Sequence, residues 1–113
     1  MIKIDNEYNI TMTRGDTFAK TLTLTKGGKP YTPASGDVIK FTMSRTYKGK
    51  MGYRPLLEKV IDHETMLWII DASDTESMEY GKYVYDLEIT YGDTGYVETF
   101  ADRKTLMLTE EVG

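Results

Sequence analysis

His63 is the residue whose type and neighbours come closest to those of a catalytic base. It lies between Asp62 and Glu64 in an expected turn, and adjacent carboxylates can orient a histidine for proton transfer. A hydrolase triad would also need a positioned serine and an orienting acid. No Gly-x-Ser-x-Gly nucleophile elbow supplies that serine. We therefore expect a solvated loop histidine and no enzyme, with no catalytic residue.

Two groups of carboxylates have spacings that could suit catalysis or metal binding. Asp86 and Glu88 alternate on an expected strand, which places them on one face about 7 Å apart, a separation that suits glycosidic hydrolysis. Asp71, Asp74 and Glu76 could offer oxygens to calcium. A solvated sheet face explains the first pair, and a helix start explains the second group through capping and the helix dipole. We expect these plainer roles.

The chain has few of the side chains that usually bind metals or cofactors. The chain has no cysteine and a single histidine, which excludes disulfides, thiolate nucleophiles and a two-histidine metal site within one chain. We expect no cofactor and no metal.

Two short motifs match known recognition signals. Arg14-Gly15-Asp16 is the tripeptide that integrins bind, and Asn9-Ile10-Thr11 fits the N-glycosylation pattern. Short matches arise often by chance, and we expect no secretory leader in the first residues, because Asp5 and Glu7 interrupt any apolar run. We expect a glycine turn at the first motif and an ordinary strand start at the second.

The basic segment 45–54 is the best candidate for a contact surface. It interleaves four cations with two tyrosines, contains two glycines and has no regular pattern, so we expect a long exposed loop over 46–54. Such a mixture can stack nucleic-acid bases or form protein contacts. The whole chain is acidic, with a formal charge of −4, which favours protein over nucleic acid. The expected contact residues are Arg45, Tyr47, Lys48, Lys50, Tyr53 and Arg54.

A tyrosine stripe offers a different possibility, a sugar-binding platform. Tyr83, Tyr85 and Tyr91 share one face of an expected strand, but Leu87 and Ile89 are in the same phase. We therefore expect the stripe to belong to the core.

The elements that must position these residues are strands. Sixteen threonines and nine tyrosines favour β-structure, and apolar residues alternate with period two. Residues 56–61 suit either helix or strand, and their brevity and surroundings favour a strand. A capping box at Ser73 and Glu76 predicts one helical turn near 73–79. The expected strands are 9–13, 17–25, 38–45, 56–61, 65–70 (a central strand), 82–91, 96–101 and 104–109, with a tight turn at 26–29 and an irregular stretch from 30 to 36.

About eight short strands in 113 residues predict a single all-β domain over 1–113, an antiparallel sandwich or barrel. No apolar run approaches the length that a membrane span needs, so we expect no membrane insertion. The expected core is Phe18, Leu22, Leu24, Phe41, Trp68, Ile70, Tyr83, Leu87, Ile89 and Leu108.

The run Tyr80-Gly81-Lys82-Tyr83-Val84-Tyr85-Asp86-Leu87 resembles the corner before strand F of immunoglobulin-like domains. In that motif the hydroxyl of the tyrosine, here Tyr83, bonds a backbone group upstream. Tyr85 stands where antibody domains have cysteine, and Trp68 is not on the third strand. These departures argue against an antibody-type domain and leave a general immunoglobulin-like sandwich.

A wider layout spans nearly the whole chain. It includes residues 12–18 (Met-Thr-Arg-Gly-Asp-Thr-Phe), 28–31 (Gly-Lys-Pro-Tyr), 36–42 and the 80–87 run. This layout is similar to immunoglobulin-like domains of phage and prophage tail and baseplate proteins of Gram-positive bacteria, especially the N-terminal domain of baseplate upper proteins. The resemblance implies a structural or assembly role in a virion.

We therefore expect a non-catalytic virion module that contacts other virion or baseplate proteins, or further copies of itself, and no nucleic acid. Synthesis in the bacterial host cytoplasm and later incorporation into the virion follow from that role. The alternative is a carbohydrate-binding sandwich that helps adhesion. It predicts exposed, coplanar aromatic side chains.

Overall fold

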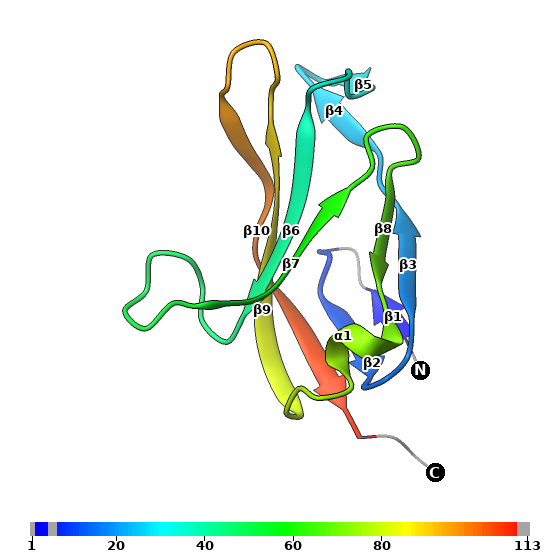
Figure 1. Cartoon of the computed structure of the whole chain (residues 1–113), viewed down its shortest axis with the longest axis vertical. Coiled ribbons are helices and arrows are strands. Elements are labelled where there is room, and N and C mark those ends of the chain that lie inside the picture. Colours follow the sequence, from blue (N-terminus) through cyan, green and yellow to red (C-terminus); the bar gives the residue numbers. More distant parts are fainter. Residues whose placement is uncertain (1, 5–6, 111–113) are drawn as a thin grey trace.

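A computed structural model describes residues 2–4 and 7–110, and these residues form a β-rich structure with one short helix (Figure 1). The large sheet has six strands, and two smaller sheets have two strands each. The elements in chain order are β1 (Ile2–Ile4), β2 (Ile10–Thr13), β3 (Phe18–Thr21), β4 (Leu24–Lys26), β5 (Lys29–Tyr31), β6 (Val38–Ser44), β7 (Pro55–Ile61), β8 (Leu67–Ile70), α1 (Ala72–Thr75), β9 (Gly81–Thr90) and β10 (Val97–Thr109).

The large sheet has the strand order β1-β2-β10-β9-β6-β7. Its neighbours are antiparallel except for β2 and β10, which are parallel and place Leu106 beside Ile10. The expectation of a purely antiparallel arrangement is therefore wrong at this pair. Two strands that lie at opposite ends of the sequence can pair in this way because the whole chain separates them, which leaves ample length for the crossover.

Alternation decides which face of the large sheet is buried. In β9 every second residue from Tyr83 to Ile89 is buried, and β6 buries Ile39, Phe41 and Met43 on the same side. Nine of the ten expected core residues are buried, and Leu24 is half-buried against the core. The buried rings confirm the expectation for Tyr83 and Tyr85, whereas Tyr91 is only partly buried against the core.

Trp68 is the centre of the aromatic core, yet its strand is not central. Its ring lies 4.8 Å from that of Phe18, 5.2 Å from that of Phe41 and 5.3 Å from that of Tyr85, measured between centroids. β8 pairs only with β3, in a small sheet that faces the large one across these rings. The apolar run at 65–70 reflects packing between layers and not a central position in a sheet.

The expected strand over 17–25 is broken in the structure. β3 ends at Thr21, and β4 turns away to pair with β5 in a separate hairpin. The tight turn of that hairpin is where the sequence predicts it, with Gly27 and Gly28 both at positive φ. The expected irregular stretch from 30 to 36 is wrong at its start, because β5 extends to Tyr31.

The two expected strands at the end of the chain are one long strand. β10 runs from Val97 to Thr109 and changes register with β9 between Thr99 and Lys104. Arg103 adopts a left-handed φ of 52° within that irregularity. The interruption that separated the two expected strands is therefore a β-bulge, which inserts extra residues without ending the strand.

The helix begins earlier and is shorter than the capping-box pattern predicts. α1 covers Ala72–Thr75, and its N-cap is Asp71 in place of Ser73. The Asp74 carboxylate accepts a hydrogen bond of 2.8 Å from the Asp71 backbone N–H. An Asp-x-x-Asp arrangement two residues upstream therefore takes the role expected of Ser73 and Glu76, with the same physical basis.

The corner between α1 and β9 has the hydrogen bond that the resemblance implies. The Tyr83 hydroxyl donates to the Glu79 backbone carbonyl at 2.7 Å. In the described part of the chain, no helix is long and apolar enough to cross a membrane.

Candidate functional site

The candidate contact loop, residues 45–54, joins β6 to β7 and projects away from both sheets, to the left in Figure 1. Its base is fixed by Arg45. The guanidinium donates to the Lys82 carbonyl at 2.9 Å and lies 3.3 Å from a Glu79 carboxylate oxygen. The same group sits 4.2 Å over the ring of Tyr83. Arg45 therefore attaches the loop to the start of β9.

Two consecutive turns shape the tip of the contact loop. The N–H of Lys50 donates to the Tyr47 carbonyl at 3.2 Å, and the N–H of Tyr53 donates to the Lys50 carbonyl at 3.1 Å. Gly49 and Gly52 hold φ values of +95° and +83°, which glycine adopts without steric cost. Met51 lies between them with its side chain 96% exposed. The tip is a tight, hydrogen-bonded structure that presents an apolar side chain to solvent.

Tyr47 attaches one side of the loop to the bulge of β10. The Arg103 guanidinium lies 4.3 Å from the Tyr47 ring centroid, and the Lys50 ammonium lies 5.8 Å from it. Both distances fall within the range of cation–π attraction. Tyr47 remains 37% exposed, so the edge of its ring is available to a partner.

Tyr53 and Lys48 turn toward the outer face of the large sheet, the face opposite the core. Burial raises the pKa of the Tyr53 phenol, and the nearby Asp86 carboxylate raises it further. Burial also raises the pKa of Asp86, a second contribution comes from Glu88, and the Lys48 ammonium opposes both. The loop base therefore covers the acidic outer face and brings cations close to its carboxylates.

Arg54 lies on the other side of the loop base, in an open groove of about 550 Å³. The groove separates the start of β7 from the corner between α1 and β9. The structure therefore places five of the six expected contact residues on two sides of one loop base, and the sixth, Lys50, lies at the tip. The groove is lined by Arg45, Arg54, Leu56, Asp74, Ser77, Met78, Glu79 and Tyr83.

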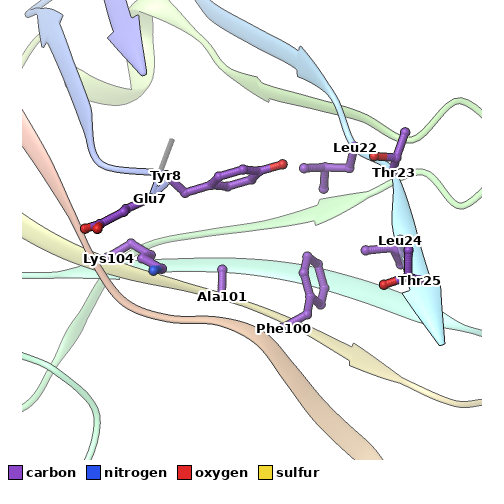
Figure 2. A pocket seen from close by; sticks show the side chains of 9 residues that line it. All are labelled: Glu7, Tyr8, Leu22, Thr23, Leu24, Thr25, Phe100, Ala101 and Lys104. Atoms are coloured by element: carbon purple, nitrogen blue, oxygen red, sulfur yellow. The ribbon is translucent and has the colours of Figure 1, made fainter. Parts of the chain in front are cut away.

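A second hollow, of about 280 Å³, opens between the bulge of β10 and the segment that joins β3 to β4 (Figure 2). The rings of Tyr8, just before β2, and Phe100, on β10, both point into it, and Leu22 lies beyond the Tyr8 hydroxyl at one end. The Lys104 ammonium and the Glu7 carboxylate lie at the other end. The remaining lining residues are Thr23, Leu24, Thr25 and Ala101.

Backbone irregularities create this hollow. The bulge of β10 places Phe100, Ala101 and Lys104 around the same space, as bulges do when they redirect side chains. Tyr8 has a left-handed φ of 66°, and its carbonyl accepts a hydrogen bond from the buried Tyr85 hydroxyl. The sequence pattern contains a signal for the bulge, the break in alternation near 102–104, but none for the conformation of Tyr8.

His63 and the Asp86–Glu88 pair, which the sequence offered as possible catalytic groups and for which we expected plainer roles, lie in separate parts of the described structure. His63 lies between β7 and β8, with its two ring nitrogens 3.9 Å from Asp62 and 3.9 Å from Glu64. Glu88 is on the outer face of the sheet, 3.7 Å from the Lys40 ammonium.

The carboxylates near α1 already have a cation. The Lys59 ammonium lies 2.9 Å from Asp71 and 2.7 Å from Asp74, and Glu76 is the C-cap residue of α1. Among the described residues, no group of three or more potential ligands could hold a metal ion. Lys59 is also an inward-pointing charge on the edge strand β7, a feature that discourages pairing with another sheet.

The two short recognition motifs have structural roles. Arg14 donates to the Met78 carbonyl at 3.1 Å and lies 4.1 Å over the Tyr80 ring, while Gly15, at φ +88°, forms the expected turn. The Asn9 side-chain oxygen accepts hydrogen bonds from the Thr105 N–H at 3.1 Å and from its hydroxyl at 3.0 Å. Asn9 thus extends the pairing of β2 with β10 by one residue.

Comparisons of the chain with protein-family models, with curated proteins and with solved structures found no match in any of the three.

Proposed function

We propose that this chain is a non-catalytic assembly module of a phage or prophage tail or baseplate, and that it acts through protein–protein contacts of the loop 45–54. The supporting observation is the combination of a fixed base and an exposed tip. Arg45 attaches the loop to β9, whereas Met51 at the tip is 96% exposed. An ordered loop loses little conformational entropy when a partner binds, so its contacts translate into affinity.

The proposal includes an immunoglobulin-like sandwich as the fold. It is supported by the hydrogen bond from Tyr83 to the Glu79 carbonyl, which matches the tyrosine corner of that class. The two layers that enclose Trp68 also agree with such a sandwich. The resemblance to baseplate domains supplies the virion setting.

The test is incorporation into particles. A tagged full chain, expressed in cells that are producing the particles, is expected to co-sediment with purified tails or baseplates. Met51→Glu alters only the exposed tip and should reduce co-sedimentation at least severalfold, because it places a charge where an apolar contact is expected. Tyr96→Glu is the matched control, since Tyr96 is 73% exposed on a different loop.

Two results would contradict the proposal. If the unaltered chain stays out of the particles, the assembly role is wrong. If Met51→Glu and a variant with 46–53 replaced by a short turn both enter particles as well as the unaltered chain, the contact surface lies elsewhere. Circular dichroism of each variant confirms that the fold is retained.

A carbohydrate-binding module is the second candidate function. The aromatic platform first considered for it is excluded, because Tyr83 and Tyr85 are 2% exposed and Trp68 is fully buried. The hollow between Tyr8 and Phe100 gives the candidate a different basis, since it combines two rings with hydroxyl and charged groups. Titration with cell-wall glycans, monitored by amide chemical shifts at Phe100 and Ala101, tests it. An absence of shifts at millimolar glycan would exclude it.

A further inference from the structure

The groove beside Arg54 has one charge that the described structure does not neutralise. Both carboxylates that line the groove have partners: Asp74 bonds Lys59 at 2.7 Å, and Glu79 lies 3.3 Å from Arg45. Arg54 is exposed and forms no ion pair with any of the described residues. A partner that enters the groove therefore encounters one unpaired guanidinium.

Beside these charged groups and Ser77, the groove is lined by three apolar or aromatic side chains. Leu56 is 39% exposed, Met78 is half-buried against the core, and the ring of Tyr83 lies below the Arg45 guanidinium. The groove thus has a cation at one position and an apolar surface beside it. Arginine and aromatic groups next to apolar surface are the composition in which binding energy concentrates at protein interfaces.

Charge is also strongly segregated along the chain. The ten residues from Arg45 to Arg54 contain four of the 14 basic residues and none of the 18 acidic ones. The remaining 103 residues therefore carry ten basic and 18 acidic side chains, a formal charge of −8. The contact loop therefore attracts an acidic partner more strongly than the rest of the chain does, and this difference favours one orientation of the partner.

We infer that the groove binds an acidic segment of a partner protein, with an aspartate or glutamate carboxylate paired to Arg54 and an adjacent apolar side chain on Leu56 and Met78. Guanidinium groups bind carboxylates through two parallel hydrogen bonds, which adds geometric selectivity to the charge attraction. This inference rests on the proposed function, because it names the chemistry of the partner that the contact loop meets.

A protein segment fits this site better than a nucleic acid. A nucleic-acid strand is a continuous polyanion, and its affinity depends on neutralising several phosphates along its length. Beyond the contact loop the strand would meet a surface of net negative charge. A short acidic segment can instead pair one carboxylate with Arg54 and keep its apolar neighbours against the apolar side chains of the groove.

The test uses the full chain and a fluorescein-labelled short peptide that alternates aspartate with leucine, measured by fluorescence anisotropy. The dissociation constant is expected to rise about tenfold in Arg54→Gln and to recover only partly in Arg54→Lys, which lacks the planar fork. Leu56→Ser should weaken binding severalfold. Lys29→Gln is the matched control, since it removes the same charge from the exposed strand β5 and should leave the dissociation constant unchanged.

Several outcomes would overturn the inference. Equal binding to the unaltered chain and Arg54→Gln would do so, as would equal binding of a peptide that alternates asparagine with leucine. Arg54-dependent binding of an oligothymidine probe that displaces the peptide would assign the groove to nucleic acid. Self-association that depends on Arg54 and resists the peptide, seen by sedimentation velocity, would assign it to a second copy of the chain.

The particle assay separates this inference from the proposed function. If Met51→Glu prevents incorporation but the acidic peptide does not bind, the partner chemistry is wrong and the assembly role stands. If the peptide binds through Arg54 but the chain never enters particles, the groove still binds acidic segments and the assembly role is wrong.

Discussion

The hydroxyl of Tyr83 donates a 2.7 Å hydrogen bond to the backbone carbonyl of Glu79, four residues upstream. The ring of the same tyrosine carries the Arg45 guanidinium at 4.2 Å. One side chain therefore holds both the corner before β9 and the base of the contact loop. A substitution that moves the Tyr83 ring is therefore expected to shift Arg45 and the base of the contact loop as well.

Removing the Tyr83 hydroxyl is expected to weaken the fold. Tyr83→Phe keeps the ring and its contact with Arg45 but leaves the Glu79 carbonyl without its donor, which should lower the free energy of unfolding by about 1 kcal/mol. Urea denaturation measures the change. Tyr96→Phe is the control, because Tyr96 is largely exposed and should behave like the unaltered chain. Equal stability of the two variants would contradict the role given to the corner.

Gly92 is expected to tolerate no side chain. A methyl group there would lie 2.6 Å from the Gly36 carbonyl oxygen, and backbone cannot swing away as a side chain can. We expect Gly92→Ala to cost about 1–3 kcal/mol, the usual range for overpacking. Gly95→Ala serves as the comparison: it has open space at φ +74° and should cost about 1 kcal/mol from strain alone. Thermal unfolding of both variants decides whether Gly36 and Gly92 are held together rigidly.

Asp37 should make stability depend on acid pH. Its carboxylate accepts hydrogen bonds from the Tyr31 hydroxyl at 2.5 Å and from the N–H groups of Ala34 and Gly92, both at 2.9 Å. The Tyr31 bond, followed by those from Gly92 and Ala34, lowers the pKa of Asp37 below its ordinary value of 3.8. The stabilisation is therefore complete above about pH 4 and is lost as the pH falls through the lowered value. The urea midpoint of the unaltered chain should fall between pH 7 and pH 2. The midpoint of Asp37→Asn should fall less over the same range.

The same hydrogen bond predicts a loss of stability in alkali. The Asp37 carboxylate raises the pKa of Tyr31 from 10.0 to about 12. A raised phenol pKa stabilises the folded chain below pH 10, and the contribution disappears as the pH rises toward 12. Absorbance of phenolate in the unaltered chain and in Asp37→Asn measures it. A Tyr31 that titrates at the same pH in both proteins would show that Asp37 is not its partner.

Asp86 is expected to reduce stability at neutral pH. Burial raises the pKa of its carboxyl, and Glu88 raises it further, so the charged form is disfavoured in the folded state. Asp86→Asn removes that cost and should increase the free energy of unfolding by about 0.5 kcal/mol at pH 7. The gain should shrink as the pH falls and the native carboxyl takes up a proton. A destabilised variant at pH 7 would mean that the attraction to Lys48 outweighs the burial.

Periodicity in the sequence was sufficient to locate most strands and nearly all of the core. Alternation from Tyr83 to Ile89 and from Ile39 to Met43 assigns one face to the interior, because successive side chains of a strand point to opposite sides. The glycines at 27 and 28 identified the tight turn of the β4–β5 hairpin, since only a residue without a β-carbon adopts their φ values freely. Segment 56–61 suited either a helix or a strand, and the preference for a strand, based on its brevity and its neighbours, is confirmed by β7.

Pairing and position depended on tertiary contacts that local patterns do not encode. Nothing near Leu106 indicates that β10 lies parallel to β2, and the apolar run around Trp68 does not reveal that β8 pairs only with β3. Contacts between distant segments also decided that Arg45 attaches the loop to the β9 corner and that Arg54 lines a groove. The sequence by itself determined an all-β chain with an exposed basic loop, because side-chain period and turn chemistry are local properties. The tertiary structure decided the strand order, the bulge and the side of the loop on which each cation lies, because these depend on which distant surfaces pack together.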